Sequence, residues 1–92
     1  MTVTVFQFWS DTCNPCRVIK PSLQALQEDF EGQIEWISIN TKQDEKGVAR
    51  LLNVTMVPTL VVVRDGMEVG RITGTQVALM YTLIRKAIAM GA

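Results

Sequence analysis

The sequence contains no histidine and only two cysteines among its 92 residues. Without histidine, Ser–His and Cys–His catalysis is excluded within this chain. Two cysteines cannot build the disulfide network that stabilises many small secreted domains. A structural zinc site needs about four ligands, usually Cys or His, so zinc binding would require a second subunit. We therefore expect no metal site within the chain.

Net charge and long apolar runs are also lacking. Nine basic residues balance nine acidic ones without a visible basic stripe, so we expect no nucleic-acid partner. No apolar run approaches the roughly 20 residues that cross a bilayer, so we expect no membrane association. Residues 1–9 lack the basic start and small-residue cleavage site of a signal peptide. We therefore expect a cytoplasmic protein, unless a leader has been removed.

The composition that remains is that of a globular protein. Hydrophobic residues make up 48% and charged residues 20%, which argues against intrinsic disorder. No repeat, low-complexity tract or linker divides the chain, and its length suits one hydrophobic core. We predict a single domain over residues 1–92.

Hydrophobic periodicity and turn residues predict four strands and three helices. In chain order these are a strand at 3–9, a helix at 15–30, a strand at 34–40, a helix at 44–52, strands at 59–63 and 68–73, and a helix at 75–89. The first two strands flank a helix and should be parallel, whereas the short turn at Asp65 and Gly66 makes the last two antiparallel. The βαβαββα order predicts an α/β fold, a four-stranded mixed sheet with helices on both faces.

Several details of the helices can be predicted. Pro15 suits the first helical position and Asn14 the N-cap, while Pro21 should kink the first helix. The charged run at 42–46 is expected to be the solvated start of the second helix. The residues expected to face inward are Ile19, Leu23, Leu26 and Phe30, then Val48, Leu51 and Leu52, and finally Val77, Met80, Tyr81, Ile84 and Ile88.

Cys13 and Cys16 stand where a predicted strand meets a predicted helix, with Asn14 and Pro15 as the loop between them. Their spacing brings two sulfurs close enough for a disulfide. Cys13 would face the free N–H groups and positive end of the helix dipole, which favours the nucleophilic thiolate. Lowering a thiol pKa from about 8.5 to about 7 raises the ionised fraction at pH 7 from about 3% to about half. Cys16, one turn into the helix, should be more buried and suited to resolving a mixed disulfide.

This pattern alone is also compatible with two unrelated cysteines or with half of a metal site. A strand before the cysteines, a proline between them, a helix after them and the lack of further ligands favour redox chemistry.

The residues around the cysteines carry a family resemblance. Residues 8–17 read F-W-S-D-T-C-N-P-C-R and resemble the thioredoxin signature F-W-A-x-W-C-G-P-C-K. Pro21 matches that family's proline five residues after the second cysteine, and residues 57–60 match its V-P-T-L. Asp65 with Gly66 resembles its hairpin turn, and Gly74 its glycine before the last helix. The resemblance covers essentially the whole chain.

The resemblance implies a thioredoxin fold and a thiol–disulfide oxidoreductase that reduces protein disulfides. Cys13 would attack the substrate disulfide, and Cys16 would resolve the mixed disulfide. No bound cofactor is implied. The implied partners are protein disulfide substrates and a dithiol reductase, such as thioredoxin reductase, that recharges the oxidised protein.

The resemblance also implies where substrates dock. Pro58 would follow a cis peptide bond and face the disulfide, and the backbone of Val57 would pair with an extended substrate peptide. The implied apolar docking patch consists of Trp9, Pro15, Val57 and Gly74.

The chain departs from the family pattern at several points. It starts at the strand that carries Trp9, without the usual first strand and helix, so it resembles shortened thioredoxins and is close in size to a glutaredoxin. The strand at 34–40 should therefore be an exposed edge, which in an otherwise monomeric protein can pair with another chain at high concentration. Thr12 and Asn14 replace the tryptophan and glycine of the signature.

Gln7 is a candidate modulator because it replaces the family's buried acid, whose lysine partner has no match around residues 36–38. A glutamine cannot accept a proton at neutral pH. Without general-base help, which typically contributes about 10²–10⁴ in rate, resolution by Cys16 should be slower and should follow its own ionisation.

Two other functions fit less well. A glutaredoxin-like, glutathione-dependent oxidoreductase is disfavoured by Pro15, because glutaredoxins place an aromatic residue before the second cysteine. Residues 74–76 also lack the glycine pair and acidic cap that hold glutathione in that family. A non-catalytic binding module with the same fold is disfavoured because both cysteines are present.

Overall fold

One four-stranded sheet organises the computed structural model, which describes residues 2–90. The strands are β1 (Val3–Trp9), β2 (Glu35–Asn40), β3 (Thr59–Arg64) and β4 (Met67–Thr73), in the spatial order β2-β1-β3-β4. β1 runs parallel to β2 and antiparallel to β3, and β3 pairs with β4 as an antiparallel hairpin. The mixed sheet is confirmed. Of the domain predicted over residues 1–92, Met1, Gly91 and Ala92 lie outside the described residues.

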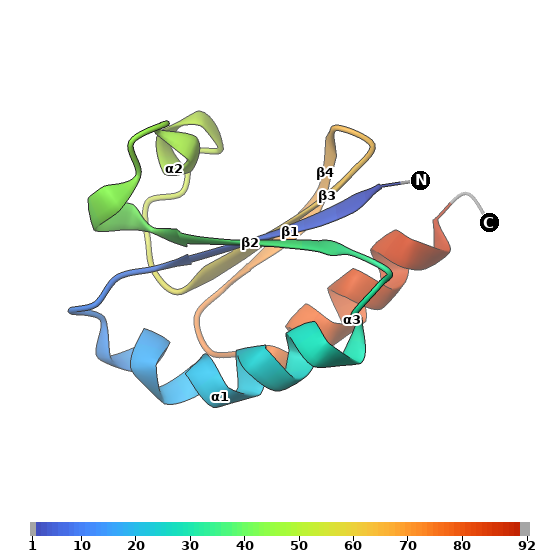
Figure 1. Cartoon of the computed structure of the whole chain (residues 1–92), viewed down its shortest axis with the longest axis horizontal. Helices are drawn as coiled ribbons and strands as arrows, with labels where there is room; N and C mark the ends of the chain where they lie inside the picture. Colours follow the sequence, from blue (N-terminus) through green and yellow to red (C-terminus); the bar gives the residue numbers. More distant parts are fainter. Residues whose placement is uncertain (1, 91–92) are drawn as a thin grey trace.

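The two long helices share one face of the sheet. Figure 1 shows α1 (Asn14–Asp29) and α3 (Val77–Ala89) together below the sheet, with the short α2 (Val48–Leu51) on the opposite side. Helices therefore lie on both faces, as predicted, but one face carries the two long helices and the other only the short α2. Among residues 2–90, none of the helices is long and apolar enough to cross a membrane.

The core fills the space between the sheet and these two helices. The predicted stripe of α1 is confirmed, because Ile19, Leu23, Leu26 and Phe30 are all buried. In α3 the buried residues are Met80, Ile84 and Ala87, which recur at helical spacing. Tyr81 was expected to face inward but is 38% exposed, and its ring rests against Phe30 with the centroids 5.3 Å apart.

The second helix is shorter than predicted, and the reason is local. The segment 44–52 was expected to be one helix, but a 3₁₀ turn, η1 (Thr41–Gln43), comes first and α2 has four residues. The Asp44 carboxylate accepts hydrogen bonds from the first two N–H groups of α2, at 3.0 and 2.8 Å, and so holds this short helix from outside. Gly47 has a φ of 66°, in the left-handed region, and this interrupts the helical conformation between η1 and α2. Leu51 was expected to face inward and is instead 79% exposed.

The two edges of the sheet differ in character. β2 is an edge strand, as predicted, and carries Ile37 at 40% exposure. The opposite edge, β4, has an irregular register against β3 and an ion pair between Arg71 and Glu68 at 2.6 Å. Irregular pairing and charge are features that keep a strand edge from pairing with other chains, and β4 has both.

Candidate active site

A tight turn after β1 carries the first cysteine. The Cys13 N–H donates to the Ser10 carbonyl at 3.2 Å, which closes the turn. The hydroxyls of Ser10 and Thr12 lie 3.3 Å apart and are hydrogen-bonded. Because β1 is paired on both sides, the turn starts from a fixed point of the sheet.

Cys13 is also the N-cap of α1. Its Sγ accepts the Cys16 N–H at 3.2 Å, so sulfur satisfies a donor that the helix cannot satisfy internally. The expectation that Asn14 is the N-cap was wrong by one residue, because the Cys13 side chain already fills that role. Asn14 and Pro15 are the first two helical residues. Pro15 there gives up no helical hydrogen bond, since its position has no intrahelical acceptor.

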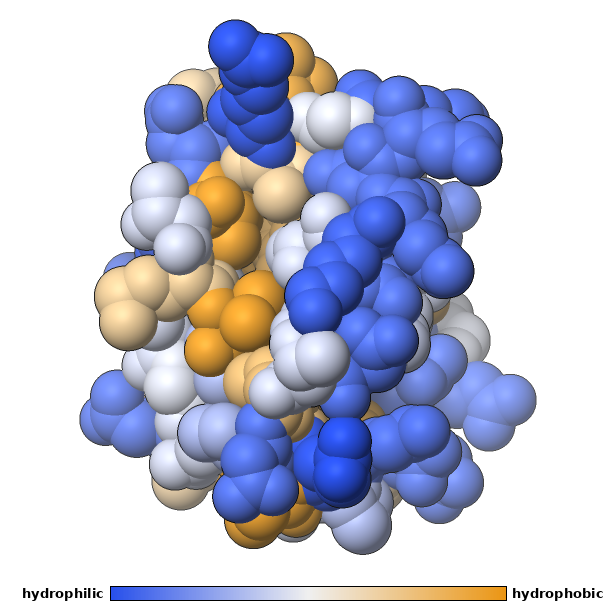
Figure 2. All heavy atoms as spheres, turned by 90° about the vertical axis from the view of Figure 1, so that its left-hand side faces the viewer, coloured by the Kyte–Doolittle hydropathy of each residue, from blue (hydrophilic) through white to orange (hydrophobic). Residues whose placement is uncertain are grey.

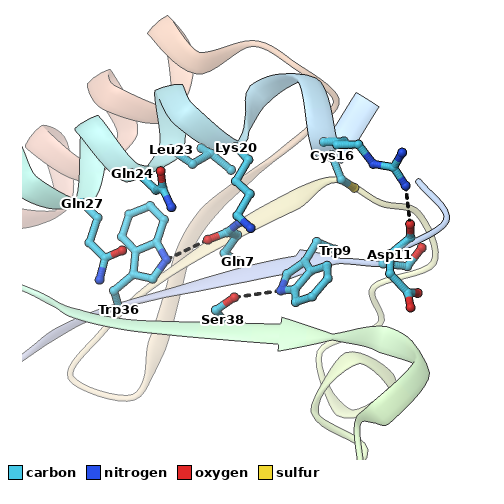
Figure 3. Close-up of a pocket in the computed structure, with 12 residues that line it drawn as sticks. Gln7, Trp9, Asp11, Cys16, Lys20, Leu23, Gln24, Gln27, Trp36 and Ser38 are labelled. Atoms are coloured by element: carbon cyan, nitrogen blue, oxygen red, sulfur yellow. Dashed lines mark hydrogen bonds between the residues drawn. The ribbon is translucent and has the colours of Figure 1, made fainter. Parts of the chain in front are cut away.

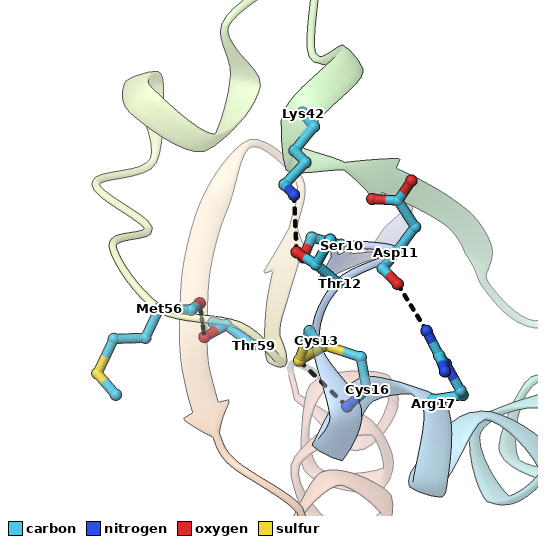
Figure 4. Close-up of a disulfide and its surroundings, with 9 residues drawn as sticks. All are labelled: Ser10, Asp11, Thr12, Cys13, Cys16, Arg17, Lys42, Met56 and Thr59. Carbon is cyan, nitrogen blue, oxygen red and sulfur yellow. Dashed lines mark hydrogen bonds between the residues drawn. A yellow bond between two sulfur atoms is a disulfide. The ribbon is translucent and has the colours of Figure 1, made fainter.

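The two cysteines form a disulfide, drawn in Figure 4, with their Cα atoms 5.3 Å apart. Cys16 is 8% exposed, whereas Cys13 is half-buried. The sulfur of Cys13 is therefore the one that an incoming thiol or disulfide can reach. The described part of the chain contains no group of three or more Cys, Asp or Glu side chains that could hold a metal ion.

The structure brings together part of the predicted docking site. The Val57–Pro58 peptide bond is cis, as the resemblance implied, and the Gly74 N–H donates to the Pro58 carbonyl at 2.8 Å. Pro58 itself is buried, and Val57 is half-buried. Figure 2, which views the end of the molecule that bears the turn, shows apolar residues gathered near the centre of that face between polar margins. Met56, in the loop before β3, is 64% exposed, and in Figure 4 its side chain extends away from the disulfide.

Trp9, the fourth aromatic or apolar residue of the implied docking patch with Pro15, Val57 and Gly74, is held on the sheet. Its indole N–H donates to Ser38 Oγ at 2.8 Å, so the ring is fixed on the sheet next to β2. There it lines a cavity of about 500 Å³, together with Cys16, between α1 and the strands (Figure 3).

Gln7 lines the same cavity as Cys16. Its Oε1 accepts a hydrogen bond from the Trp36 indole N–H at 2.9 Å, so the carboxamide oxygen already has one partner. Around residues 36–38, where the family's lysine has no match, Trp36 is hydrogen-bonded to Gln7 and Ser38 to Trp9, both on β1. Lys20 supplies a cationic side chain in this cavity from α1 instead (Figure 3).

Sequence reasoning missed Lys20 and Lys42. Lys20 follows Cys16 by four residues, a spacing that puts both on one face of a helix. Lys42 follows β2, which is parallel to β1, so both strands deliver their C-terminal ends to the same end of the sheet. The Lys42 Nζ donates to Thr12 Oγ1 at 2.7 Å. The segment 42–46 is thus not the start of a helix, and Lys42 is bonded to the turn before Cys13.

Comparisons with known proteins agree with this geometry. The family model described as Thioredoxin matches residues 1–86. The chain is 32% identical over 74 residues to the thioredoxin of Staphylococcus aureus (strain MW2), an alignment that covers 80% of this chain and 70% of the relative. The X-ray structure of Fasciola hepatica thioredoxin superimposes with a TM-score of 0.85 at 30% identity, covering 94% of this chain and 81% of that one. The reduced Schistosoma mansoni thioredoxin pre-protein gives a TM-score of 0.83 at 26% identity, covering 92% and 78%.

The difference in exposure between the two cysteines leads to a labelling prediction. When the reduced protein is treated with iodoacetamide at neutral pH, we expect Cys13 to be alkylated first. Its sulfur is accessible and lies at the positive end of α1, where the thiolate is favoured. Peptide mapping by mass spectrometry over a time course measures both rates, and faster labelling of Cys16 would reverse the two roles.

Proposed function

Because this chain belongs to the thioredoxin family and is a protein thiol–disulfide oxidoreductase, we propose that it reduces protein disulfides with Cys13 as nucleophile and Cys16 as resolving thiol. The observation that carries the assignment of roles is the cysteine pair at the start of α1, with Cys13 accessible and Cys16 buried. The cap contact between them places the attacking sulfur at a helix N–H group.

The reaction consists of two exchanges. The Cys13 thiolate attacks one sulfur of the substrate disulfide, whose other sulfur leaves as a thiolate and takes a proton from solvent. Cys16 then loses its proton and attacks Cys13 Sγ, which releases the second substrate thiolate. Two electrons have passed to the substrate, and the protein is left with the Cys13–Cys16 disulfide found in this structure. A dithiol reductase returns the two electrons.

Substrate docking is proposed at the segment opposite the disulfide. The backbone of Val57 would pair with an extended substrate segment, while the hydrogen bond between Gly74 and Pro58 holds the residue that follows it. The apolar centre of this face suits the apolar flanks of such a segment (Figure 2). Trp9 would contribute from the side of Cys16.

The family implies a reductase partner in general, and we propose that a thioredoxin reductase supplies the electrons. Glutathione is the competing donor, and Pro15 before the second cysteine disfavours it. We further propose a cytoplasmic location, because a dithiol that donates electrons must be kept reduced by its compartment.

We expect the protein to catalyse insulin reduction by dithiothreitol. Cys13→Ser should abolish the activity, whereas Cys16→Ser should retain attack and accumulate a mixed disulfide with the substrate, visible by non-reducing electrophoresis. Thioredoxin reductase with NADPH should sustain turnover better than glutathione with its reductase. Absence of turnover in the wild-type protein would support a binding module, and preference for glutathione would support a glutaredoxin-like enzyme.

Gln7 allows a test of proton transfer during resolution. A carboxylate in the Gln7 position would share the cavity with Cys16 and could take its proton, so Gln7→Glu should speed resolution near neutral pH. Glutamate keeps the length of glutamine and an acceptor for the Trp36 N–H, whereas Gln7→Asp is one methylene shorter. Burial of an acid costs stability, although the Lys20 ammonium in the same cavity offsets part of that cost.

Stopped-flow rates of mixed-disulfide resolution, from about pH 6 to about pH 9, measure this effect across the range in which thiols ionise. In the wild-type protein the rate should rise with the ionisation of Cys16 alone. Gln27→Glu, on the exposed side of the same cavity, is the matched control for adding a negative charge. Identical profiles for wild type and Gln7→Glu would leave Gln7 as a hydrogen-bonded packing residue only.

The exposed edge of β2 leads to a prediction about association. We propose a monomer at micromolar concentration that pairs edge to edge through β2 at millimolar concentration. Ile37→Lys should abolish the pairing, because a lysine on an edge strand opposes strand addition. Met67→Lys on the other edge, β4, is the control and should change nothing. Sedimentation velocity over a concentration series measures both, and a wild-type monomer throughout the series contradicts the pairing.

A further inference from the structure

A lysine from a different element is bonded to the turn that carries the attacking cysteine. Lys42 lies in η1, directly after β2, and its Nζ donates to Thr12 Oγ1 at 2.7 Å (Figure 4). Thr12 in turn is hydrogen-bonded to Ser10, whose carbonyl accepts the Cys13 N–H. A continuous set of contacts therefore connects the ammonium of Lys42 to the backbone of Cys13.

The charges around the disulfide show why this ammonium matters. Of the nine residues drawn in Figure 4, three are charged, namely Asp11, Arg17 and Lys42. The Arg17 guanidinium donates to the Asp11 backbone carbonyl at 2.8 Å, on the α1 side of the turn. In Figure 4 the Asp11 carboxylate points away from the sulfurs. The segments from Met56 to Pro58 and from Gly74 to Gln76 bring no charge, so two cations and one anion are the charges among these residues.

Neutral side chains around Cys13 leave few other groups to stabilise its thiolate. The chain has no histidine, and the loop residues Asn14 and Pro15 are uncharged. Beyond the Cys16 N–H and the dipole of α1, two cations are bonded to the turn: Arg17 at the Asp11 carbonyl, and Lys42 at the side chain of Thr12, the residue directly before Cys13. A cation next to an ionisable thiol favours the thiolate over the thiol.

We propose that Lys42 is a positioning residue for disulfide exchange: it holds the turn through Thr12 and keeps a positive charge beside Cys13, which favours the attacking thiolate. The inference rests on the proposed role of Cys13 as nucleophile and deepens it. It also gives a function to Thr12, where the family signature has tryptophan, because a hydroxyl accepts the ammonium hydrogen bond and an indole ring cannot.

The test is the pH dependence of Cys13 alkylation by iodoacetamide, a neutral reagent that the lysine charge does not attract. Lys42→Met removes the charge at similar length and should raise the midpoint of the profile by about half a pH unit, the size expected for one exposed charge. For a thiol with a pKa of about 7, the rate at pH 7 should fall about twofold as the thiolate fraction drops. Lys42→Arg should keep the wild-type midpoint, and the shift should shrink at about 1 M salt, where charges are screened within about 3 Å.

Two further variants separate the effect of the Lys42–Thr12 hydrogen bond from the effect of the Lys42 charge. Thr12→Val keeps the ammonium but removes its acceptor, and should also raise the midpoint. Adding Lys42→Met to Thr12→Val should then have little further effect, because residues that act through one contact are not additive. Lys46→Met, in the exposed turn after η1, is the matched control and should leave the midpoint unchanged.

The inference is overturned if Lys42→Met leaves the midpoint at the wild-type value, if Lys46→Met shifts it as much, or if the Thr12 and Lys42 effects simply add. These outcomes are distinct from failure of the proposed function. Alkylation reports on the Cys13 sulfur directly, whereas insulin reduction by the same variants reports on turnover. A normal Lys42 effect without insulin reduction would retain the positioning role and reject the reductase.

Discussion

The hydrogen bond from the Cys16 N–H to Cys13 Sγ is the contact on which the rest of the site depends. It makes the reacting sulfur the N-cap of α1, so the position of that sulfur is fixed by the packing of a whole helix. The helix in turn is held by its buried stripe, from Ile19 to Phe30, against the sheet. A change that loosens this stripe would therefore move the sulfur as well as cost stability.

The position of β1 explains how distant segments meet at this helix start. β1 lies between β2 and β3, so the turn that follows it is bordered by the segments at the ends of both neighbours. The segment after β2 supplies Lys42, and the loop before β3 supplies Met56 and the cis peptide bond. The hydrogen bond between Gly74 and Pro58 fixes the start of β3 to the end of β4. Sheet order, not sequence distance, assembles the site.

Most of the fold was predictable from the sequence because its signals are strong and local. The β-branched run of β1, the stripe of α1 and the Asp65–Gly66 turn each permit few other structures. The failures involve side chains that compete with the backbone. The Cys13 sulfur displaced Asn14 as N-cap, and the Asp44 carboxylate with Gly47 shortened the second helix and left Leu51 exposed. Neither effect is visible in hydrophobic periodicity.

The candidate site, like the fold, could be predicted from the sequence only in part. The cysteine pair and the proline before β3 lie in contiguous motifs, so they could be recognised directly. The contact of Lys42 with Thr12 and that of Trp36 with Gln7 depend on which strands are neighbours and in which register. The sequence alone does not reveal that register, because it does not show which strands are neighbours.

The short distance between the two cysteines also determines how long a partner can stay attached. With their Cα atoms 5.3 Å apart on one helix start, Cys16 acts on a mixed disulfide as a tethered reactant with a high effective molarity. A free thiol in solution would have to compete with that tethered neighbour and would rarely reach the sulfur first. Under the proposed mechanism, the covalent complex is thus a brief stage, and the substrate leaves once Cys16 has reacted.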